Sequence, residues 1–261
     1  MSAESFRPRP MTRHGKPIAD GRMPLVCVSL MGLDRESLLA ESESLVRAGV
    51  DVLEWRVDHY GLRSDLSVVM DTAQSLRAAL PETPLIFTYR SVGEGGRGLP
   101  VAPAVHIEML LSAAEKTTFD FIDVEMSLGE SVVAQICSTA GLTGTQCILS
   151  VHDFLGTPDE PALYAYFAKA AQWGGSVAKV AVMPQSADDV LRLLTATRRA
   201  AQSLPIPIIS MAMGQLGAMS RIYGAEFGSA LTFAAAENSS APGQIALAEM
   251  QALLQAAYRQ G

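Results

Sequence analysis

Lys179 lies in the middle of the segment VAKVAVMP, residues 177–184, whose other residues are valine, alanine, methionine and proline. This composition is typical of a buried strand, so the sequence predicts an ammonium group in an apolar environment. A lysine that is desolvated or placed near other cations loses its proton more readily and becomes a nucleophilic amine. Such an amine condenses with a carbonyl compound to an iminium ion, which acidifies the neighbouring C–H bond. The alternative is a structural ion pair with Asp123 or Glu125.

One histidine and three arginines extend this chemistry. Of the four histidines, only His152 is expected at the end of a strand on its polar face, where it is suited to general acid and base catalysis. Arg56, Arg90 and Arg221 are candidates for a cationic field around the lysine. They also imply a carboxylate or phosphate on the substrate, because guanidinium groups bind such anions strongly. The residues alone therefore predict an enzyme that uses a lysine amine, and no cofactor, on an anionic carbonyl compound.

Polar and apolar side chains alternate along several predicted strands. Successive side chains point to opposite faces of a strand, so Glu54, Arg56 and Asp58 share one face. The same alternation groups further polar pairs: Thr88 with Arg90, Asp123 with Glu125, and Ser150 with His152. In a barrel whose outer surface is covered by helices, the apolar faces pack outward and the polar faces point inward. Charged side chains there, near the carboxyl ends of the strands, indicate a reaction chamber.

The elements that must position these residues repeat along the chain. Eight segments read as strands: 25–32, 52–58, 84–90, 121–126, 146–154, 177–184, 206–213 and 227–235. Segments with helical spacing lie between them and after the last one. Eight strands alternating with eight helices predict an α/β fold, a (β/α)8 TIM barrel, with a doubly wound open sheet as the alternative. Thr157 and Ser186 are the expected N-caps of two of the helices.

The chain shows no linker or change of composition that would divide it. We expect a single catalytic domain over residues 21–261, preceded by a short N-terminal extension, residues 1–20, that is a flexible tail. The residues before Pro24 fall outside the repeat and are placed to cover the lower end of the barrel. This N-terminal segment is basic and rich in proline, and it lacks the apolar stretch of a secretory signal, so we expect a cytoplasmic protein.

Charge and composition exclude several classes of partner. The net charge of −7 opposes binding to nucleic acid or to an anionic membrane surface, and no apolar run approaches the roughly 20 residues of a membrane span. The cysteines Cys27, Cys137 and Cys147 are widely spaced, which predicts reduced thiols. Asp123, Glu125 and His152 could ligate a metal, but no H-x-H pattern accompanies them, and we expect no metal.

Three segments are expected around the mouth of the barrel. GEGGRG, residues 93–98, lacks the spacing of a phosphate-binding loop and is interpreted as a loop that brings Glu94 over the mouth. Met211 and Met213 are expected to form an apolar wall. Residues 237–244, ENSSAPGQ, are either a lid over the site or an ordinary surface loop.

Eight motifs in register closely resemble the type I 3-dehydroquinate dehydratases, from about Ser29 to Gln244. They are VSLMG (28–32), EWRVD (54–58), FTYRSVGEGG (87–96), VHDF (151–154), AKVAVMPQS (178–186), SMAMGQLGAMSR (210–221), GSALTF (228–233) and SAPGQI (240–245). The resemblance implies a TIM barrel, usually a homodimer, that dehydrates the small molecule 3-dehydroquinate to 3-dehydroshikimate on the shikimate route to aromatic compounds. Tyr89 stands where many relatives have phenylalanine, and we expect it to point toward the helices.

The resemblance also implies roles for individual residues. Lys179 would be the Schiff-base lysine, His152 the proton shuttle, and Glu94 the group that orients that histidine. The remaining positions that match the family would bind substrate: Ser29, Glu54, Arg56, Arg90 and Ser240 at the ring hydroxyls or neighbouring groups, and Arg221 and Gln244 at the carboxylate and in closing the lid. Two alternatives stay open, a Schiff-base aldolase-like lyase and a non-catalytic relative that binds a shikimate-pathway metabolite.

Overall fold

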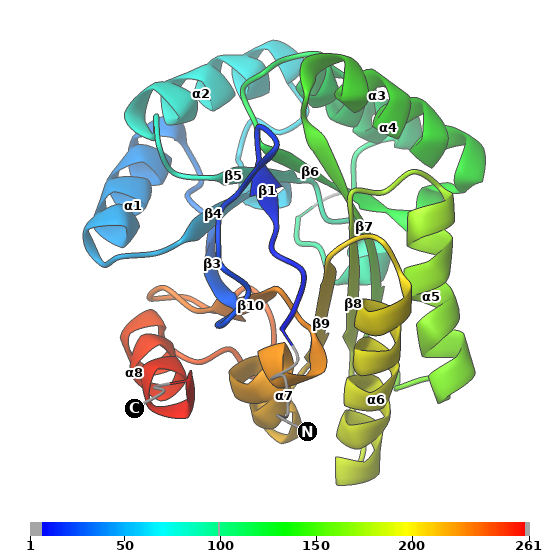
Figure 1. Ribbon diagram of the computed structural model, residues 1–261. Coiled ribbons are helices and arrows are strands. Elements are labelled where there is room, and N and C mark those ends of the chain that lie inside the picture. The colour runs from blue at the N-terminus through cyan, green and yellow to red at the C-terminus, as the bar shows by residue number, and fades with distance from the viewer. Residues whose placement is uncertain (1–6, 99, 259–261) are drawn as a thin grey trace.

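Eight parallel strands form a barrel in the computed structural model, which describes residues 7–98 and 100–258 (Figure 1). They are β3 Leu25–Leu30, β4 Val52–Arg56, β5 Leu85–Thr88, β6 Phe121–Glu125, β7 Gln146–Asp153, β8 Val177–Val182, β9 Ile208–Ala212 and β10 Leu231–Ala234. Parallel ladders run from β10 through β3 to β9, and a parallel bridge between Ile208 and Ser229 closes the remaining side. The predicted (β/α)8 barrel is confirmed.

Helices cover the outside of the barrel (Figure 1). They are α1 Arg35–Arg47, α2 Leu66–Ala79, α3 Pro103–Ala114, α4 Glu130–Thr143, α5 Glu160–Gln172, α6 Ala187–Ser203, α7 Ala218–Tyr223 and α8 Leu247–Tyr258. The outward strand residues, such as Val180 and Val182, pack with the helices in one continuous apolar cluster. Within residues 7–98 and 100–258, no helix is long and apolar enough to cross a membrane.

Of the two predicted helix N-caps, one is correct. Ser186 caps α6 in a capping box with Asp189, as its hydroxyl accepts a hydrogen bond from the Asp189 backbone N–H. Thr157 is not the cap of α5. That helix starts after Asp159, whose carboxylate accepts from the Ala162 N–H, and a proline occupies its first turn.

Three strands are shorter than the alternation of side chains predicts. The segment 52–58 leaves the barrel after Arg56 and forms a 3-10 turn, Val57–His59. The strand in 84–90 ends at Thr88. Residues Gly224–Phe227 form another 3-10 turn, followed by Gly228 at φ 106°, so β10 starts only at Leu231. Composition alone does not separate these turns from strands, because their side chains are also buried.

The barrel interior is apolar below and polar above. The lower part is an apolar cluster to which all eight barrel strands contribute, including Val52, Ile86, Phe121, Ile148 and Val177. Two residues further along these strands come Glu54, Thr88, Asp123, Ser150 and Lys179, all buried. Since side chains alternate along a strand, these polar residues lie on the same inward face, one layer higher. The predicted polar chamber is therefore present at the carboxyl ends of the strands.

The N-terminal residues close the lower end of the barrel. β1 Thr12–Arg13 and β2 Lys16–Pro17 form a short hairpin, and Met11 is fully buried in the lower apolar cluster. Arg13 donates to Asp120 at 2.8 Å. The expectation of a flexible tail over residues 1–20 is therefore corrected for residues 7–20, because the buried methionine and the ion pair hold them against the barrel. Residues 1–6 lie outside the described residues.

Candidate active site

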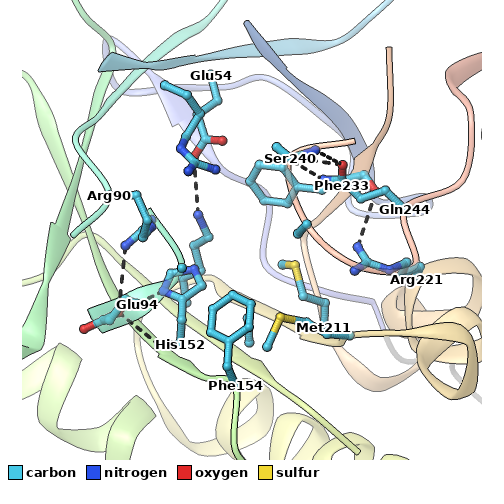
Figure 2. A pocket seen from close by; sticks show the side chains of 16 residues that line it. Glu54, Arg90, Glu94, His152, Phe154, Met211, Arg221, Phe233, Ser240 and Gln244 are labelled. Atoms are coloured by element: carbon cyan, nitrogen blue, oxygen red, sulfur yellow. Dashed lines mark hydrogen bonds and ion pairs between the residues drawn. The ribbon is translucent and has the colours of Figure 1, made fainter. Parts of the chain in front are cut away.

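A pocket at the carboxyl ends of the strands brings the predicted site residues together (Figure 2). It encloses about 460 Å³, including space open to solvent. Nine of the ten predicted site residues line it: Glu54, Arg56, Arg90, Glu94, His152, Lys179, Arg221, Ser240 and Gln244. The tenth, Ser29, lies behind them and donates to Glu54 at 2.6 Å. Residues from five strands, from the loops that follow strands and from α7 thus converge on one cavity, as expected for the active face of a barrel.

Lys179 is buried and held by two carboxylates. Its Nζ lies 2.8 Å from Asp123 Oδ2 and 3.5 Å from Glu54 Oε1, and 4.6 Å above the centre of the Phe233 ring. The ion pair with Asp123 is therefore present, whereas Glu125 pairs with Arg90 instead. The nearest charged partners of Nζ are therefore carboxylates, while the three arginines predicted around the lysine line the same pocket.

The arginines near the lysine are themselves paired. Arg90 contacts Asp123 at 2.8 Å and Glu125 at 3.1 Å, and these carboxylates raise the pKa of the arginine against the opposing effect of burial. Burial raises the pKa of Asp123, but Arg90 and Lys179 outweigh it and hold that pKa well below its ordinary range. Arg56 forms two hydrogen bonds with Asp58, at 2.7 and 2.8 Å. The chamber is thus a compensated network of charges.

His152 and Glu94 form a hydrogen-bonded pair. His152 Nδ1 lies 2.9 Å from Glu94 Oε2, and the His152 backbone N–H donates to the same oxygen at 3.0 Å. Ser127 donates to the other carboxylate oxygen at 2.8 Å. Burial, and then the nearby Glu125, raises the pKa of Glu94 to about 7. Burial, and then the nearby Arg90, lowers the pKa of His152 well below its ordinary value.

The hydrogen bond with Glu94 determines which ring nitrogen of His152 carries the proton. Because Glu94 Oε2 accepts from the backbone N–H, it is positioned to accept from Nδ1–H as well, which assigns the imidazole proton to Nδ1. The neutral ring then carries its free electron pair on Nε2. His152 and Lys179 come from the neighbouring strands β7 and β8, where Ser150 is in register with Lys179. A base and an amine therefore share the same pocket.

Arg221 differs from the other arginines because it has no carboxylate partner among the described residues. It is 1 % exposed, and it donates only to backbone carbonyls, those of Phe233 at 3.5 Å and Pro242 at 3.1 Å. Its Nε has no hydrogen-bond partner within residues 7–98 and 100–258. Burial lowers its pKa to about 10. A buried, uncompensated cation that lines a pocket is suited to bind an anionic group.

Residues 237–244 lie over this side of the pocket. The Ser240 hydroxyl lies 3.0 Å from that of Ser29, and the Ser240 N–H donates to Gln244 Oε1 at 2.8 Å. The Pro242 carbonyl accepts from Arg221 and from the Gly214 N–H. The loop is thus fastened across the mouth, which is the placement that a lid requires. That it opens stays a prediction.

Aromatic and methionine side chains complete the lining. Met211 and Met213 line the pocket, so the predicted apolar wall is confirmed. Phe154 and Phe233, which were not predicted as site residues, also line it. The alternation of side chains could have predicted both, because Phe154 follows His152 by two residues and Phe233 lies on the inward face of β10. Tyr89 points outward as expected, with its ring centre 4.6 Å from that of His106 on α3.

The carboxylates of the chamber are engaged by cations of the protein. Over residues 7–98 and 100–258, no cluster of three histidine, cysteine, aspartate or glutamate residues is arranged to hold a metal ion. Asp123 and Glu125, which the sequence analysis considered as ligands, contact Lys179 and Arg90 instead.

The fold and this pocket define an enzyme built on a (β/α)8 barrel. Residues 26–260 match the family model described as type I 3-dehydroquinase. The chain belongs to the type I 3-dehydroquinase family, which is a family of carbon–oxygen lyases, and the resemblance seen in the motifs is confirmed.

Individual relatives match this chain in sequence and structure over nearly its whole length. The chain is 41% identical over 246 residues to a 3-dehydroquinate dehydratase of Albidiferax ferrireducens, covering 94% of this chain and 93% of the relative. It superposes on the crystal structure of the 3-dehydroquinate dehydratase of Geobacillus kaustophilus with a TM-score of 0.91 and 37% identity, covering 97% of this chain and 99% of that one. A type I enzyme of Clostridium difficile, crystallised with covalently modified comenic acid, superposes with a TM-score of 0.90 and 34% identity, covering 96% and 98%.

Proposed function

We propose that this chain dehydrates 3-dehydroquinate to 3-dehydroshikimate through an iminium intermediate on Lys179, with His152 as general acid and base. The family of the chain supports the reaction. The observation that carries the mechanism is the buried Lys179 in a pocket with a neutral His152 and the uncompensated cation Arg221. The amine supplies the covalent attachment, the imidazole moves protons, and the arginine holds an anionic substrate.

The steps follow from the positions of these groups. The Lys179 ammonium gives up a proton, its amine attacks the ring ketone, and water leaves to form the iminium. The Nε2 of His152 removes the proton from the adjacent ring carbon, which yields an enamine. The enamine expels the β-hydroxyl group as His152 returns the proton. Hydrolysis of the resulting iminium releases the product and regenerates the lysine.

The remaining predicted residues would hold the substrate in this geometry. Arg221 and Gln244 bind its carboxylate under the loop 237–244, since the arginine has no other anionic partner among the described residues. The other positions, Ser29, Glu54, Arg56, Arg90 and Ser240, bind or order the groups around the ring. Glu94 keeps the Nδ1 proton of His152 in place, so that Nε2 faces the substrate.

Trapping with borohydride tests the covalent step. Borohydride added with 3-dehydroquinate reduces the iminium and fixes a mass increment on the peptide that contains Lys179. Active protein without that adduct would overturn the covalent mechanism. Lys179→Ala abolishes trapping, whereas His152→Ala retains some imine formation but blocks turnover. A near-normal rate in His152→Ala removes the histidine from acid and base catalysis.

A spectroscopic assay separates the proposed reaction from the alternatives. Dehydration of 3-dehydroquinate creates a conjugated enone, which appears as a new ultraviolet absorbance. An aldolase-like lyase would give cleavage of a carbon–carbon bond instead, and a non-catalytic binding protein would give neither signal.

Three further expectations follow from the family resemblance. We propose that the enzyme serves the shikimate route, acts as a homodimer and works in the cytoplasm. Sedimentation of the purified protein at several concentrations tests the dimer, and a monomer throughout would contradict it. Fractionation of the source cells tests the compartment.

A further inference from the structure

We propose that Asp123 is the counter-ion of the iminium formed on Lys179, so that this carboxylate keeps the imine nitrogen protonated and electron-withdrawing. The inference rests on the proposed Schiff-base function. Its starting observation is the shortest polar contact of the lysine, 2.8 Å between Nζ and Asp123 Oδ2. Both side chains are buried, Asp123 at 1 % and Lys179 at 4 % exposure. The carboxylate therefore touches the atom that becomes the imine nitrogen.

Condensation replaces one cation by another at this position. A lysine ammonium and a ketone give an iminium and one water molecule: one C–N double bond forms, the carbonyl oxygen leaves with two protons, and the single positive charge stays on nitrogen. A carboxylate that pairs with the ammonium is thus already in place for the iminium. This matters because only the protonated imine is a strong electron sink for the carbanion formed next to it.

Hydrogen-bond geometry selects Asp123 over Glu54 as the partner. The ammonium has three N–H donors and can face both carboxylates, but the iminium keeps one. Glu54 lies farther from Nζ, at 3.5 Å, and its two oxygens already accept from Ser29 and Thr88. Asp123 keeps Oδ2 for the lysine, since its other contacts fall on Oδ1. The single remaining donor therefore belongs to Asp123.

The surroundings hold Asp123 as an oriented anion. Its Oδ1 accepts a hydrogen bond from Ser150 at 2.6 Å and forms an ion pair with Arg90 at 2.8 Å. These two contacts hold the carboxylate and keep Oδ2 directed at Nζ. On the other side of the lysine, the Phe233 ring lies 4.6 Å from Nζ and adds a second interaction that favours a cation there. The surroundings of Nζ thus stabilise a positive charge at this position.

The chain offers a matched control on the same strand. Glu125 lies two residues after Asp123 on the same face of β6, is equally buried at 1 % and also pairs with Arg90. Its contacts are Arg90 and the Ser91 N–H rather than Lys179. Comparison of Asp123→Asn with Glu125→Gln therefore separates loss of the counter-ion from loss of a buried carboxylate beside Arg90.

The decisive measurement is the pH dependence of trapping by cyanoborohydride, which reduces the iminium but not the neutral imine. Full-length wild type, Asp123→Asn and Glu125→Gln are mixed with saturating 3-dehydroquinate, and the adduct at Lys179 is followed by mass spectrometry. An opposite charge in contact shifts a protonation equilibrium by about 1–3 pH units, so the midpoint of trapping falls by that amount in Asp123→Asn. In Glu125→Gln it falls by less than about 0.5. Equal shifts in both variants, or none in Asp123→Asn, overturn the proposal.

Two further measurements keep the proposal falsifiable if Asp123→Asn does not fold. Asp123→Glu retains the charge, so its trapping midpoint stays within about 0.5 pH unit of wild type; a fall as large as that predicted for the asparagine variant overturns the proposal. In wild type labelled with ¹⁵N at the lysine Nζ, NMR detects a protonated imine nitrogen up to about pH 9, and a neutral imine at that pH overturns the proposal. Failure of the Schiff-base function gives a different result, namely no adduct on Lys179 in wild type.

Discussion

Glu94→Gln is expected to stabilise the protein at neutral and alkaline pH while it impairs catalysis. Glu94 is buried beside Glu125, and it is the burial that chiefly raises its pKa, to about 7. The glutamine keeps the existing hydrogen bonds, because its carbonyl oxygen can accept from the His152 backbone N–H and Nδ1–H while its amide faces Ser127. The substitution therefore removes a costly charge together with its ion pair to Arg90 at 3.9 Å.

The magnitude follows from the pKa. The pKa of Glu94 rises from its ordinary value of 4.5 to about 7 in the folded protein. A shift of one pKa unit corresponds to about 1.4 kcal/mol. Below pH 4.5 both folded and unfolded chains hold the proton. Between pH 4.5 and about 7 only the folded chain holds it, so stability falls as the pH rises and then stays constant. The ionised carboxylate thus costs about 3 kcal/mol, with little screening because the side chain is 11% exposed.

Urea unfolding of wild type and Glu94→Gln at about pH 5 and about pH 8 tests this reasoning. The free energy of unfolding of the variant, relative to wild type, should rise by about 2–3 kcal/mol between the two pH values. Ionisable groups far from Glu94 cancel in this difference, because both proteins share them. A difference that does not change with pH, or that changes in the opposite direction, would refute the desolvation argument. The same variant should lose kcat, since a neutral amide no longer stabilises the imidazolium that forms during turnover.

Two predictions concern other residues, one in the pocket and one at the lower end of the barrel. Arg221→Met should raise KM for 3-dehydroquinate roughly 10–100-fold, because one charged hydrogen-bonding partner is worth about 1.5–3 kcal/mol; steady-state kinetics measure it. Its free energy of unfolding should not fall, since an uncompensated buried cation is lost, and an unchanged KM would remove Arg221 from anion binding. Asp120→Asn should cost about 1–3 kcal/mol in urea unfolding, because Arg13 and Arg77 both pair with this carboxylate at the lower end of the barrel. An unchanged midpoint of urea unfolding would show that these ion pairs contribute nothing to stability. The kcat of Asp120→Asn should equal that of wild type, because the pocket lies at the opposite end of the barrel.

Periodicity predicted the barrel and the inward strand residues of its pocket, whereas Ser29, Ser240 and Gln244 were assigned only through the family resemblance. Alternation within each strand separates inward Lys179 from outward Val180, and it does so before any contact is known. The placement of Glu94 also followed from sequence, since its loop comes directly after a strand end. The same reasoning failed at Thr157, where a cap two residues later competes successfully. It also failed for residues 7–20, because burial of Met11 depends on a cavity that only the closed barrel provides.

By itself, the sequence determined which side chains face the barrel interior and which chemistry they can perform, because the period of a strand is a local property. Only the tertiary structure decided how their charges are paired. The lysine was expected among cations, yet Asp123 and Glu54 hold it, while Arg221 is the one arginine of the pocket that pairs with no carboxylate of the described residues. Such pairing joins residues more than 50 positions apart along the chain, such as Lys179 and Asp123. It depends on distances of a few ångströms, to which Coulomb interactions are sensitive and sequence spacing is not.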